Sequence, residues 1–391
     1  MRQHLQFSRI YCTSTTNMVS KEKRSGVLHR RTLFIQAMRR KTFESGYFTT
    51  ADIAEEADVP RSTAQDWVNR LILEGCIFVK EEKRGRSPAR YASRSAMPKS
   101  TCRRIFTTVD GDNVEIFHEC LSSGCAGFCE FHHRNAGGAA VEVSRDGMMF
   151  QERASLSSSS PINLDKAAVG LLSVELEGDE VVQTIQSVRG GPAYSLSSMM
   201  GMAKGVSGVS VSVKDGVVTG KVRTKALVPV TIGVDDTDRK GCGGATFALT
   251  HALMKYLTES GDVIPIRHQV ASLSQDIEEM TAGNSCSFLE VAVTPEAFPN
   301  LLAKVCRFVE DESVSEEWGV AILRGIFVPK EMEALAAEIR CGRVSLDYVK
   351  EKAKACGVQI FGGRGIIGAC AAVSLKHQPQ EVLLDSRVQM H

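Results

Sequence analysis

Residues 228–246 read VPVTIGVDDTDRKGCGGAT, and this stretch decides the fold of the C-terminal part of the chain. Residues 228–234 are an apolar, β-rich run, which predicts a buried strand. Acidic side chains and glycines follow this run, and a helical pattern begins near Thr246. The order of strand, acidic loop, glycines and helix predicts an α/β domain with a loop that contains Asp235, Asp236, Asp238, Gly241, Gly243 and Gly244.

The acidic loop has the composition of a metal and phosphate site. Three carboxylates within four residues repel one another unless a hard divalent cation such as Mg²⁺ shares them, and Mg²⁺ commonly binds together with phosphates. The glycines would let backbone amides approach an anion at the N-terminus of the following helix. We therefore expect the catalytic Mg²⁺ ligands to be Asp235, Asp236 and Asp238. The expected phosphate contacts are Gly241, Gly243, Gly244 and Thr246. The alternative is an ordinary exposed turn, and the stretch is not a Walker P-loop.

The helix after the glycines carries an apolar stripe that would fix its N-terminus beside the acidic loop. The stripe consists of Leu249, Ala252, Leu253, Tyr256 and Leu257.

Two later segments are candidates for the same site. Residues 283–287 read GNSCS before an apolar strand at 288–293, so Asn284 contacts a ligand or closes a turn. Residues 361–368 read FGGRGIIG after a strand at 358–361, where Arg364, between Gly363 and Gly365, offers positive charge to phosphates. Each segment alone is also typical of a turn.

These three segments occur in the order seen in the kinase-like domain of archaeal tRNA agmatinylcytidine synthetase, which residues 228–385 resemble. The resemblance implies that Asp235, Asp236 and Asp238 bind Mg²⁺ and ATP, and that the chemistry is ATP-dependent phosphoryl transfer. The chain lacks that family's OB fold and zinc ribbon, and residues 243–246 differ from its loop. The resemblance therefore does not carry agmatine or tRNA over as substrates.

A longer segment, residues 113–380, resembles the methanogenesis marker protein 11 family of methanogenic archaea. The shared features are the cysteine-bearing region, the middle region and the Gly-Val-Asp-Asp-Thr-Asp segment at residues 233–238.

Residues 31–94 read as helix, helix, turn, helix, strand, basic loop and strand, and resemble winged helix-turn-helix regulators. An apolar stripe on the third helix, Ala64, Trp67, Val68, Leu71 and Ile72, is expected to pack on Leu33, Phe34, Met38, Ile53 and Ala54. Candidate nucleic-acid contacts on this helix and in the basic loop are Arg61, Ser62, Thr63, Gln65, Lys83, Arg84, Arg86 and Arg90. The alternative is a module for protein contacts.

Charge is divided unevenly along the chain. Residues 1–104 carry 21 Lys and Arg against 10 Asp and Glu, whereas the remainder carries 26 against 36. The basic part is the one expected to meet a polyanion, with DNA ahead of RNA. Since winged-helix proteins often bind palindromes as dimers, a homodimer is expected.

Residues 118–133 contain three cysteines and three histidines in a Cys-x₄-Cys-x₃-Cys pattern. Thiolates and imidazoles at this density predict a Zn²⁺ or iron–sulfur site with Cys120, Cys125, Cys129 and His132 as ligands. Because the spacing fits no standard finger or ferredoxin run, buried or redox-active cysteines are the alternative.

The domain organisation expected from these segments is a disordered tail at 1–27, a winged helix at 28–97, an α+β middle region at 105–227 and the α/β domain at 228–385. The chain has no apolar stretch long enough for a membrane helix and no secretory signal, so we expect a soluble, cytoplasmic protein without a membrane partner. Its twelve cysteines are too dilute for a disulfide scaffold.

Two functions are consistent with these features. The first is an ATP-dependent enzyme that transfers a phosphoryl or nucleotidyl group to RNA or another acceptor. The second is a DNA-binding regulator whose C-terminal domain senses a nucleotide or metal without turnover. A third, an assembly factor that makes protein contacts, has no sequence feature in its favour.

Overall fold

The computed structural model describes residues 18–94, 100, 102–188, 198–277 and 283–390 of the chain. The chain divides into two compact units, Met1–Lys99 and Ser100–His391. The expected tail up to residue 17 lies outside the described residues. None of the described helices combines enough length and apolar character to cross a bilayer.

The first unit consists of helices followed by a β-hairpin, in the order expected from the sequence. Its elements are α1 (Met18–Ser45), α2 (Thr50–Glu56), α3 (Arg61–Leu73), β1 (Ile77–Glu81) and β2 (Arg90–Ser93). Helix α1 begins at Met18, within the segment expected to be a disordered tail. Thr49 and Asp52 form a capping box at the start of α2, which explains why the chain re-enters a helix there.

The predicted core of this unit is largely confirmed. Ala64, Val68 and Leu71 on α3 are buried, and the ring of Trp67 stacks on Phe34 with centroids 5.1 Å apart. Leu33 was wrongly placed in the core, because 49% of it is exposed. Its neighbours Phe34 and Ile35 occupy the buried face of α1 instead.

The second unit is mixed α/β and contains one large curled sheet organised around a long strand, β11 (Val217–Asp235). The first half of β11 pairs with β9 (Glu180–Val188) and β10 (Val206–Lys214). Its second half pairs with β13 (Ser285–Val293) and β14 (Gly319–Arg324). The boundary expected between residues 227 and 228 therefore falls inside a continuous strand.

The N-terminal half of this unit is mainly antiparallel sheet. Its other elements are β3 (Cys102–Asp110), β4 (Asn113–Cys120), α4 (Ser123–Ala136), β5 (Ala140–Asp146), β6 (Met149–Ser155), β7 (Ser158–Ser159), β8 (Val169–Glu177) and α5 (Ser198–Gly201). Alternating apolar residues in the middle region predict strands near residues 174–176, 209–213 and 217–222, and the structure confirms them as parts of β8, β10 and β11. The β10–β11 hairpin turns at Asp215 and Gly216, which both have positive φ.

Two further segments of the middle region involve residues that the structure does not describe. Residues 189–192 read RGGP, which predicts a turn, and they lie wholly outside the described residues. The small residues at 195–204 predict a helix, of which α5 is the described part, and residues 195–197 are outside as well.

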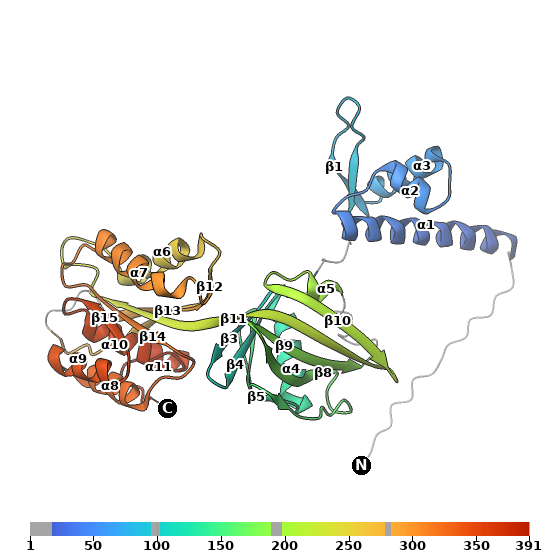
Figure 1. Cartoon of the computed structure of the whole chain (residues 1–391). Coiled ribbons are helices and arrows are strands. Elements are labelled where there is room, and N and C mark those ends of the chain that lie inside the picture. The colour runs from blue at the N-terminus through green and yellow to red at the C-terminus, as the bar shows by residue number, and fades with distance from the viewer. Residues whose placement is uncertain (1–17, 95–99, 101, 189–197, 278–282, 391) are drawn as a thin grey trace, which may run out of the picture. The chain divides into compact units, whose positions relative to one another are not determined.

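The C-terminal half is a three-layer arrangement. A sheet in the order β12, β13, β11, β14, β15 has helices on both faces (Figure 1). Its remaining elements are α6 (Thr246–Thr258), β12 (Val263–Ser272), α7 (Phe298–Glu312), α8 (Lys330–Cys341), α9 (Leu346–Ala355), β15 (Gln359–Gly362), α10 (Ile366–Ser374) and α11 (Gln380–Leu384).

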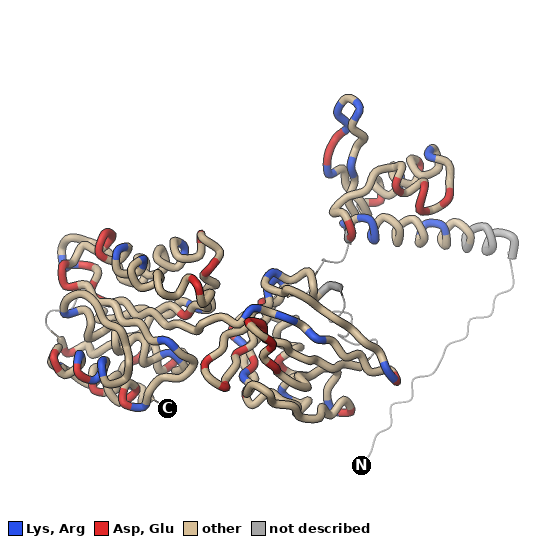
Figure 2. The backbone as a smooth tube through the Cα atoms, viewed as in Figure 1, with Lys and Arg blue, Asp and Glu red and all other residues tan. Residues whose placement is uncertain are grey.

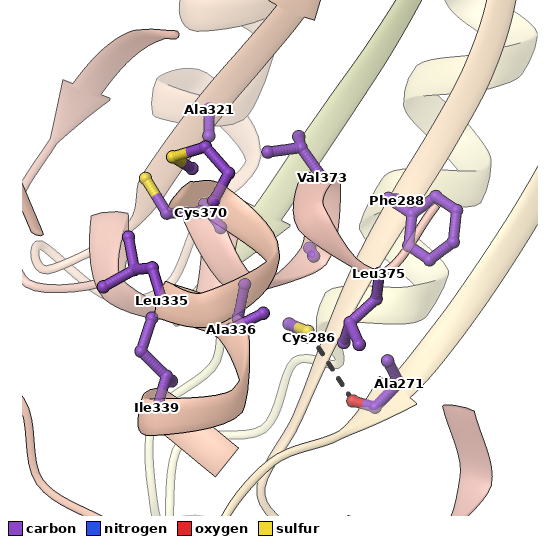
Figure 3. Packing of buried hydrophobic residues seen from close by; sticks show 14 of the residues in the cluster. Ala271, Cys286, Phe288, Ala321, Leu335, Ala336, Ile339, Cys370, Val373 and Leu375 are labelled. Atoms are coloured by element: carbon purple, nitrogen blue, oxygen red, sulfur yellow. Dashed lines mark hydrogen bonds between the residues drawn. The ribbon is translucent and has the colours of Figure 1, made fainter. Parts of the chain in front are cut away.

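Successive side chains of a strand point to opposite faces of the sheet, so this half has one core on each face. Val230, Ile232 and Val234 of β11 pack with α6 and α7. Phe288 of β13 and Ala321 of β14 point to the other face and pack with α8, α9 and α10 (Figure 3). Both faces of β11 are therefore covered, which fixes the position of the residues that follow its end.

Helix α6 begins at Thr246, as predicted, but it buries a different face from the one expected. Leu253 and Leu257 are buried together with Thr246 and Thr250, at positions i, i+4, i+7 and i+11. The exposed side chains of Ala252 and Tyr256 were wrongly assigned to the core stripe. The helix is rotated because Thr246 is bonded into the acidic loop, so that end of the buried face is polar.

Candidate functional site

A cavity at the end of β11 brings together the three segments that the sequence singled out. Asp235, Asp236 and Asp238 line it together with Asn284, Arg364 and Gly365. The cavity has a volume of about 160 Å³. Since a single water needs roughly 10–15 Å³ on this measure, the space accommodates a cation with several further ligand atoms.

The acidic loop is held by bonds within the protein. Thr237 is buried, and its backbone oxygen accepts a hydrogen bond from the Val314 amide at 2.9 Å. The Thr237 hydroxyl donates to the Thr246 hydroxyl at 3.1 Å, which in turn donates to Asp238 Oδ1 at 3.3 Å. The loop is therefore anchored to the first turn of α6, and Thr246 positions Asp238 rather than lining the cavity.

Asp236 adopts a left-handed backbone conformation with φ of 56°. This region is uncommon for residues other than glycine, although Asp and Asn enter it more readily than most. The Ser315 hydroxyl donates to Asp236 Oδ1 at 3.4 Å. This conformation turns the chain at Asp236, so that the side chains of Asp235 and Asp236 line the same cavity.

Asp235 packs closely against helix α10. A methyl group added at Gly368, in α10, would lie 1.7 Å from Asp235 Oδ2, so the carboxyl group packs directly on that glycine. Burial, reinforced by Asp236 and Asp238, raises the pKa of the Asp235 carboxyl well above its usual value. Burial also raises the pKa of Asp236. A cation shared by these carboxylates would offset both effects.

The second glycine segment packs tightly against the strand ends. The Gly363 amide donates to the Trp318 carbonyl and the Gly365 amide to the Glu317 carbonyl, each at 2.7 Å. The Arg364 amide donates to Glu317 Oε2 at 2.8 Å. These amides are therefore already bonded within the protein. Gly365 lines the cavity beside the Arg364 side chain, whereas Gly363 does not.

Asn284 is partly committed to the fold. Its side-chain nitrogen donates to the Ser274 carbonyl at 2.7 Å, which leaves the side-chain oxygen as the group to meet a ligand. Arg343 lines the same cavity, from the loop between α8 and α9, and the sequence reasoning missed it. It also missed Ser315 and Glu317, since none of the three lies in a motif. The dipeptide Gly342-Arg343 between two helical patterns was the available signal.

The first glycine group lies outside the cavity. Gly241, Gly243 and Gly244 are exposed in the loop between the acidic residues and α6, and none of them lines the cavity. Among the other lining residues, an aliphatic wall is formed by Leu273, Ile277, Ile339, Val344 and Ile367.

The raised pKa of Asp235 predicts a measurable effect on stability. A carboxyl group whose pKa is higher in the folded than in the unfolded state opposes folding once the pH exceeds the unfolded value. In the absence of divalent cations, Asp235→Asn is therefore expected to raise the melting temperature at neutral pH. We expect about 2–4 °C, which is roughly the effect of 1 kcal/mol in a domain of 150–250 residues.

Differential scanning fluorimetry in EDTA measures this effect. The gain should shrink as the pH falls toward the usual carboxyl pKa, because the wild-type group is then protonated in both states. If Asp235→Asn is less stable than the wild type, and by the same amount at neutral and at low pH, the raised pKa of Asp235 is contradicted.

A second cluster lies in the N-terminal half of the second unit. The sulfur atoms of Cys120, Cys125 and Cys129 lie within 4.8 Å of one another, an arrangement that can hold a metal ion. The structure does not place His132 in this group. His132 Nδ1 accepts a hydrogen bond from the Ala168 amide at 3.1 Å, and its ring contacts the rings of Phe128 and Phe131.

The candidate nucleic-acid residues of the first unit are only partly available. Arg61 and Ser62 are exposed at the start of α3, and Thr63 is half-buried. Gln65 accepts a hydrogen bond from Thr50 and donates one to Asn69, so its side chain is already engaged.

In the hairpin, Lys83, Arg84 and Arg86 are exposed between β1 and β2, where Figure 2 shows basic residues at the tip. Arg90 is paired with Glu81 at 2.9 Å, and its guanidinium lies over the Tyr47 ring.

Comparison with known proteins gives partial similarities. No protein-family model matches the chain. An uncharacterized protein of Methanocaldococcus jannaschii, MJ0921, is 28% identical over 215 residues, which are 54% of this chain and 71% of that protein.

Among solved structures, a complex of TiaS with tRNA and ATP is similar at 22% identity and a TM-score of 0.34, over 38% of this chain and 36% of that one. Apo TiaS, described as a tRNA agmatidine synthetase, is similar at 21% identity and a TM-score of 0.32, over 37% and 35%. The chain thus spans about a third of the length of these solved structures.

Proposed function

We propose that the cavity at the end of β11 binds ATP with Mg²⁺ and that the protein transfers a phosphoryl or nucleotidyl group from ATP to a nucleic acid. The observation that carries this proposal is the presence of three carboxylates and two arginines in one cavity. The carboxylates are Asp235, Asp236 and Asp238, and the arginines are Arg343 and Arg364.

This mixture of charges fits a metal-bound polyphosphate. The three carboxylates alone would repel a phosphate, whereas Mg²⁺ bound by carboxylate oxygens and phosphates satisfies both groups. Guanidinium groups supply the bidentate hydrogen bonds that phosphate oxygens accept. We assign the Mg²⁺ ligands to Asp235, Asp236 and Asp238, and the phosphate contacts to Arg343 and Arg364.

The aliphatic wall fits the nucleoside part of the ligand. Ile339 belongs to the same core as Leu335 and Ala336 of α8 (Figure 3). Leu273 and Val344 add apolar surface from two other segments. A planar base needs such a surface, and the side-chain oxygen of Asn284 offers an acceptor for a hydroxyl or amino group.

The proposed chemistry requires little from the protein beyond positioning. In phosphoryl transfer, the acceptor oxygen forms a bond to the terminal phosphorus, the bond to the leaving ADP oxygen breaks, and the acceptor proton passes to solvent or a carboxylate. Bound Mg²⁺ would neutralise the charge that develops on the phosphate oxygens. The chain's own part is to orient the phosphates with Arg343 and Arg364.

We further propose that the first unit is a winged helix-turn-helix that binds nucleic acid, with DNA ahead of RNA, and that it acts as a homodimer. Its exposed basic tip between β1 and β2 supports phosphate contacts, and Arg61 and Ser62 at the start of α3 support contacts to base edges. The same proposal includes three domains, at 28–97, 105–227 and 228–385. It also includes membership of the methanogenesis marker protein 11 family.

The hairpin tip gives a prediction about salt. Replacing Lys83, Arg84 and Arg86 with Ala should weaken duplex binding by at least tenfold at low salt and flatten its salt dependence, because each phosphate contact releases counterions. Fluorescence anisotropy across a salt series measures both quantities. A matched control removes three exposed lysines of the second unit, Lys255, Lys304 and Lys350. An unaltered salt slope in the tip variant would remove the hairpin from the interface.

The fate of ATP tests the function. Purified protein is incubated with ATP and Mg²⁺, total archaeal RNA or DNA fragments are added in turn, and release of ADP, AMP and pyrophosphate is followed. Release that depends on Asp236 and is stimulated by nucleic acid supports the transferase. Tight ATP binding without turnover, together with altered DNA affinity, would replace it with a nucleotide-responsive transcriptional regulator.

A further inference from the structure

The cysteine cluster lies apart from the cavity at the end of β11, and its geometry distinguishes between metals. Cys120 ends β4, while Cys125 and Cys129 lie one turn apart on α4, so that their side chains share one face of that helix. All three sulfurs lie within 4.8 Å of one another. A tetrahedral Zn²⁺ with Zn–S bonds of about 2.3 Å holds its sulfurs ~3.8 Å apart.

An iron–sulfur cluster fits this spacing less well. In a four-iron cluster each thiolate binds a different iron, so the thiolates must be further apart than around a single ion. Soft thiolate ligands in a tetrahedral set around one ion are characteristic of zinc. The distances therefore favour a mononuclear site.

The local fold favours a negatively charged thiolate at Cys125. Ser122 caps α4 by accepting a hydrogen bond from the Cys125 amide at 3.2 Å, which places Cys125 in the positive first turn of the helix. The helix dipole stabilises a thiolate at this position, and the thiolate is the form of cysteine that binds a metal ion.

Cys102 is positioned to complete the set. It begins β3 opposite Cys120, at the first register pair of the β3–β4 hairpin, and is 5% exposed. Directly paired residues of antiparallel strands have side chains on the same face of the sheet, so the Cys102 side chain lies beside that of Cys120. Phe150 and Ala126 pack around Cys120 and exclude water.

We propose that Cys102, Cys120, Cys125 and Cys129 bind one structural Zn²⁺ ion, which ties α4 to the β3–β4 hairpin. His132 takes no part, and the position expected for it belongs to Cys102. Binding replaces the remaining thiol protons, which pass to solvent. The site is independent of the nucleotide proposal, because none of its ligands lines the cavity at the end of β11.

The test uses the full-length chain, stripped of metal under reducing, anaerobic conditions and titrated with Zn²⁺ alone. Elemental analysis should give one zinc per chain, and Zn²⁺ should raise the melting temperature. Cobalt substitution should produce the visible bands of a tetrahedral thiolate site. Cys125→Ser and Cys129→Ser should each lower zinc affinity at least 100-fold, whereas Cys306→Ser on α7 should leave it unchanged.

Cys102→Ser tests the fourth ligand separately. It should lower zinc affinity at least tenfold and shift the cobalt bands, whereas His132→Ala should leave both as in the wild type. If Cys125→Ser fails to fold, the cobalt spectrum of the wild-type chain still decides the case. Three results would overturn the proposal. The first is iron with acid-labile sulfide in the purified protein, and the second is a Cys125→Ser protein that binds zinc as tightly as the Cys306→Ser control. The third is a Cys102→Ser protein whose zinc affinity is unchanged.

Discussion

Asp236→Ala is expected to lower the affinity for ATP in the presence of Mg²⁺ by about 100-fold, which corresponds to roughly 2.7 kcal/mol. The substitution removes one of three carboxylates that line the cavity, together with the acceptor of the Ser315 hydrogen bond. Without this charge the site should hold Mg²⁺ poorly, so ATP binding should respond little to the cation. Isothermal titration calorimetry with and without EDTA measures both effects.

Two further variants separate the loss of charge from a change in the loop. Asp236→Asn keeps a side chain that tolerates the left-handed backbone and can still accept from Ser315, and it should show nearly the same loss. Asp165→Ala removes an exposed carboxylate elsewhere in the second unit and should bind like the wild type. Wild-type affinity in Asp236→Asn would refute the metal role of this residue.

Gly319→Ala is expected to destabilise the second unit by about 3 kcal/mol or more, the upper range for overpacking. Gly319 begins β14 opposite Asp235, and an added methyl would lie 1.9 Å from the Gly365 carbonyl carbon and 2.0 Å from the Ile366 nitrogen. Those atoms are backbone, so a rotamer change cannot relieve the clash. The N-terminus of α10 would have to move away from β14, and this would displace Gly365, which lines the cavity.

Urea denaturation monitored by circular dichroism measures this loss, and ATP affinity should fall with it. Gly208→Ala is the matched control, because it lies in β10 and its added methyl would approach no closer than 3.6 Å to the Arg223 side chain. It should cost less than about 1 kcal/mol. If Gly319→Ala is as stable as this control, then α10 does not pack on β14 as described.

The sequence predicted the parts of the cavity that lie in regular patterns. The apolar run before Asp235 and the helix starting at Thr246 are both confirmed, because a buried strand and an amphipathic helix have recognisable periods. The order of motifs also anticipated that Asn284 and Arg364 would line the same cavity. Strands at the centre of a sheet bring their ends together whatever the length of the connections.

Residues without a local pattern were missed for a physical reason. Arg343 and Ser315 lie in loops, where no period marks a side chain, and only tertiary packing brings them to the cavity or its rim. Helix α6 buries Thr250 in preference to Tyr256, because the hydrogen bonds of Thr246 set its rotation. Hydrophobicity alone could not reveal that constraint.

The cysteine cluster shows the same limit. His132 was chosen as a ligand because it is close in sequence, and its ring is engaged elsewhere. Cys102 is distant in sequence from Cys125 and Cys129, and only the pairing of β3 with β4 brings it beside Cys120. Strand register is a long-range property, so a spacing motif could not identify it.

The central claim is that the three carboxylates at the end of β11 hold a metal-bound ATP molecule. A crystal structure of the chain with Mn²⁺ and a non-hydrolysable ATP analogue tests it most directly, because the anomalous signal locates the metal. The account predicts one Mn²⁺ ion at about 2.0–2.3 Å from oxygens of Asp235, Asp236 or Asp238, with the phosphates beside Arg343 and Arg364. Metal and nucleotide bound elsewhere, with this cavity filled only by water, would contradict it.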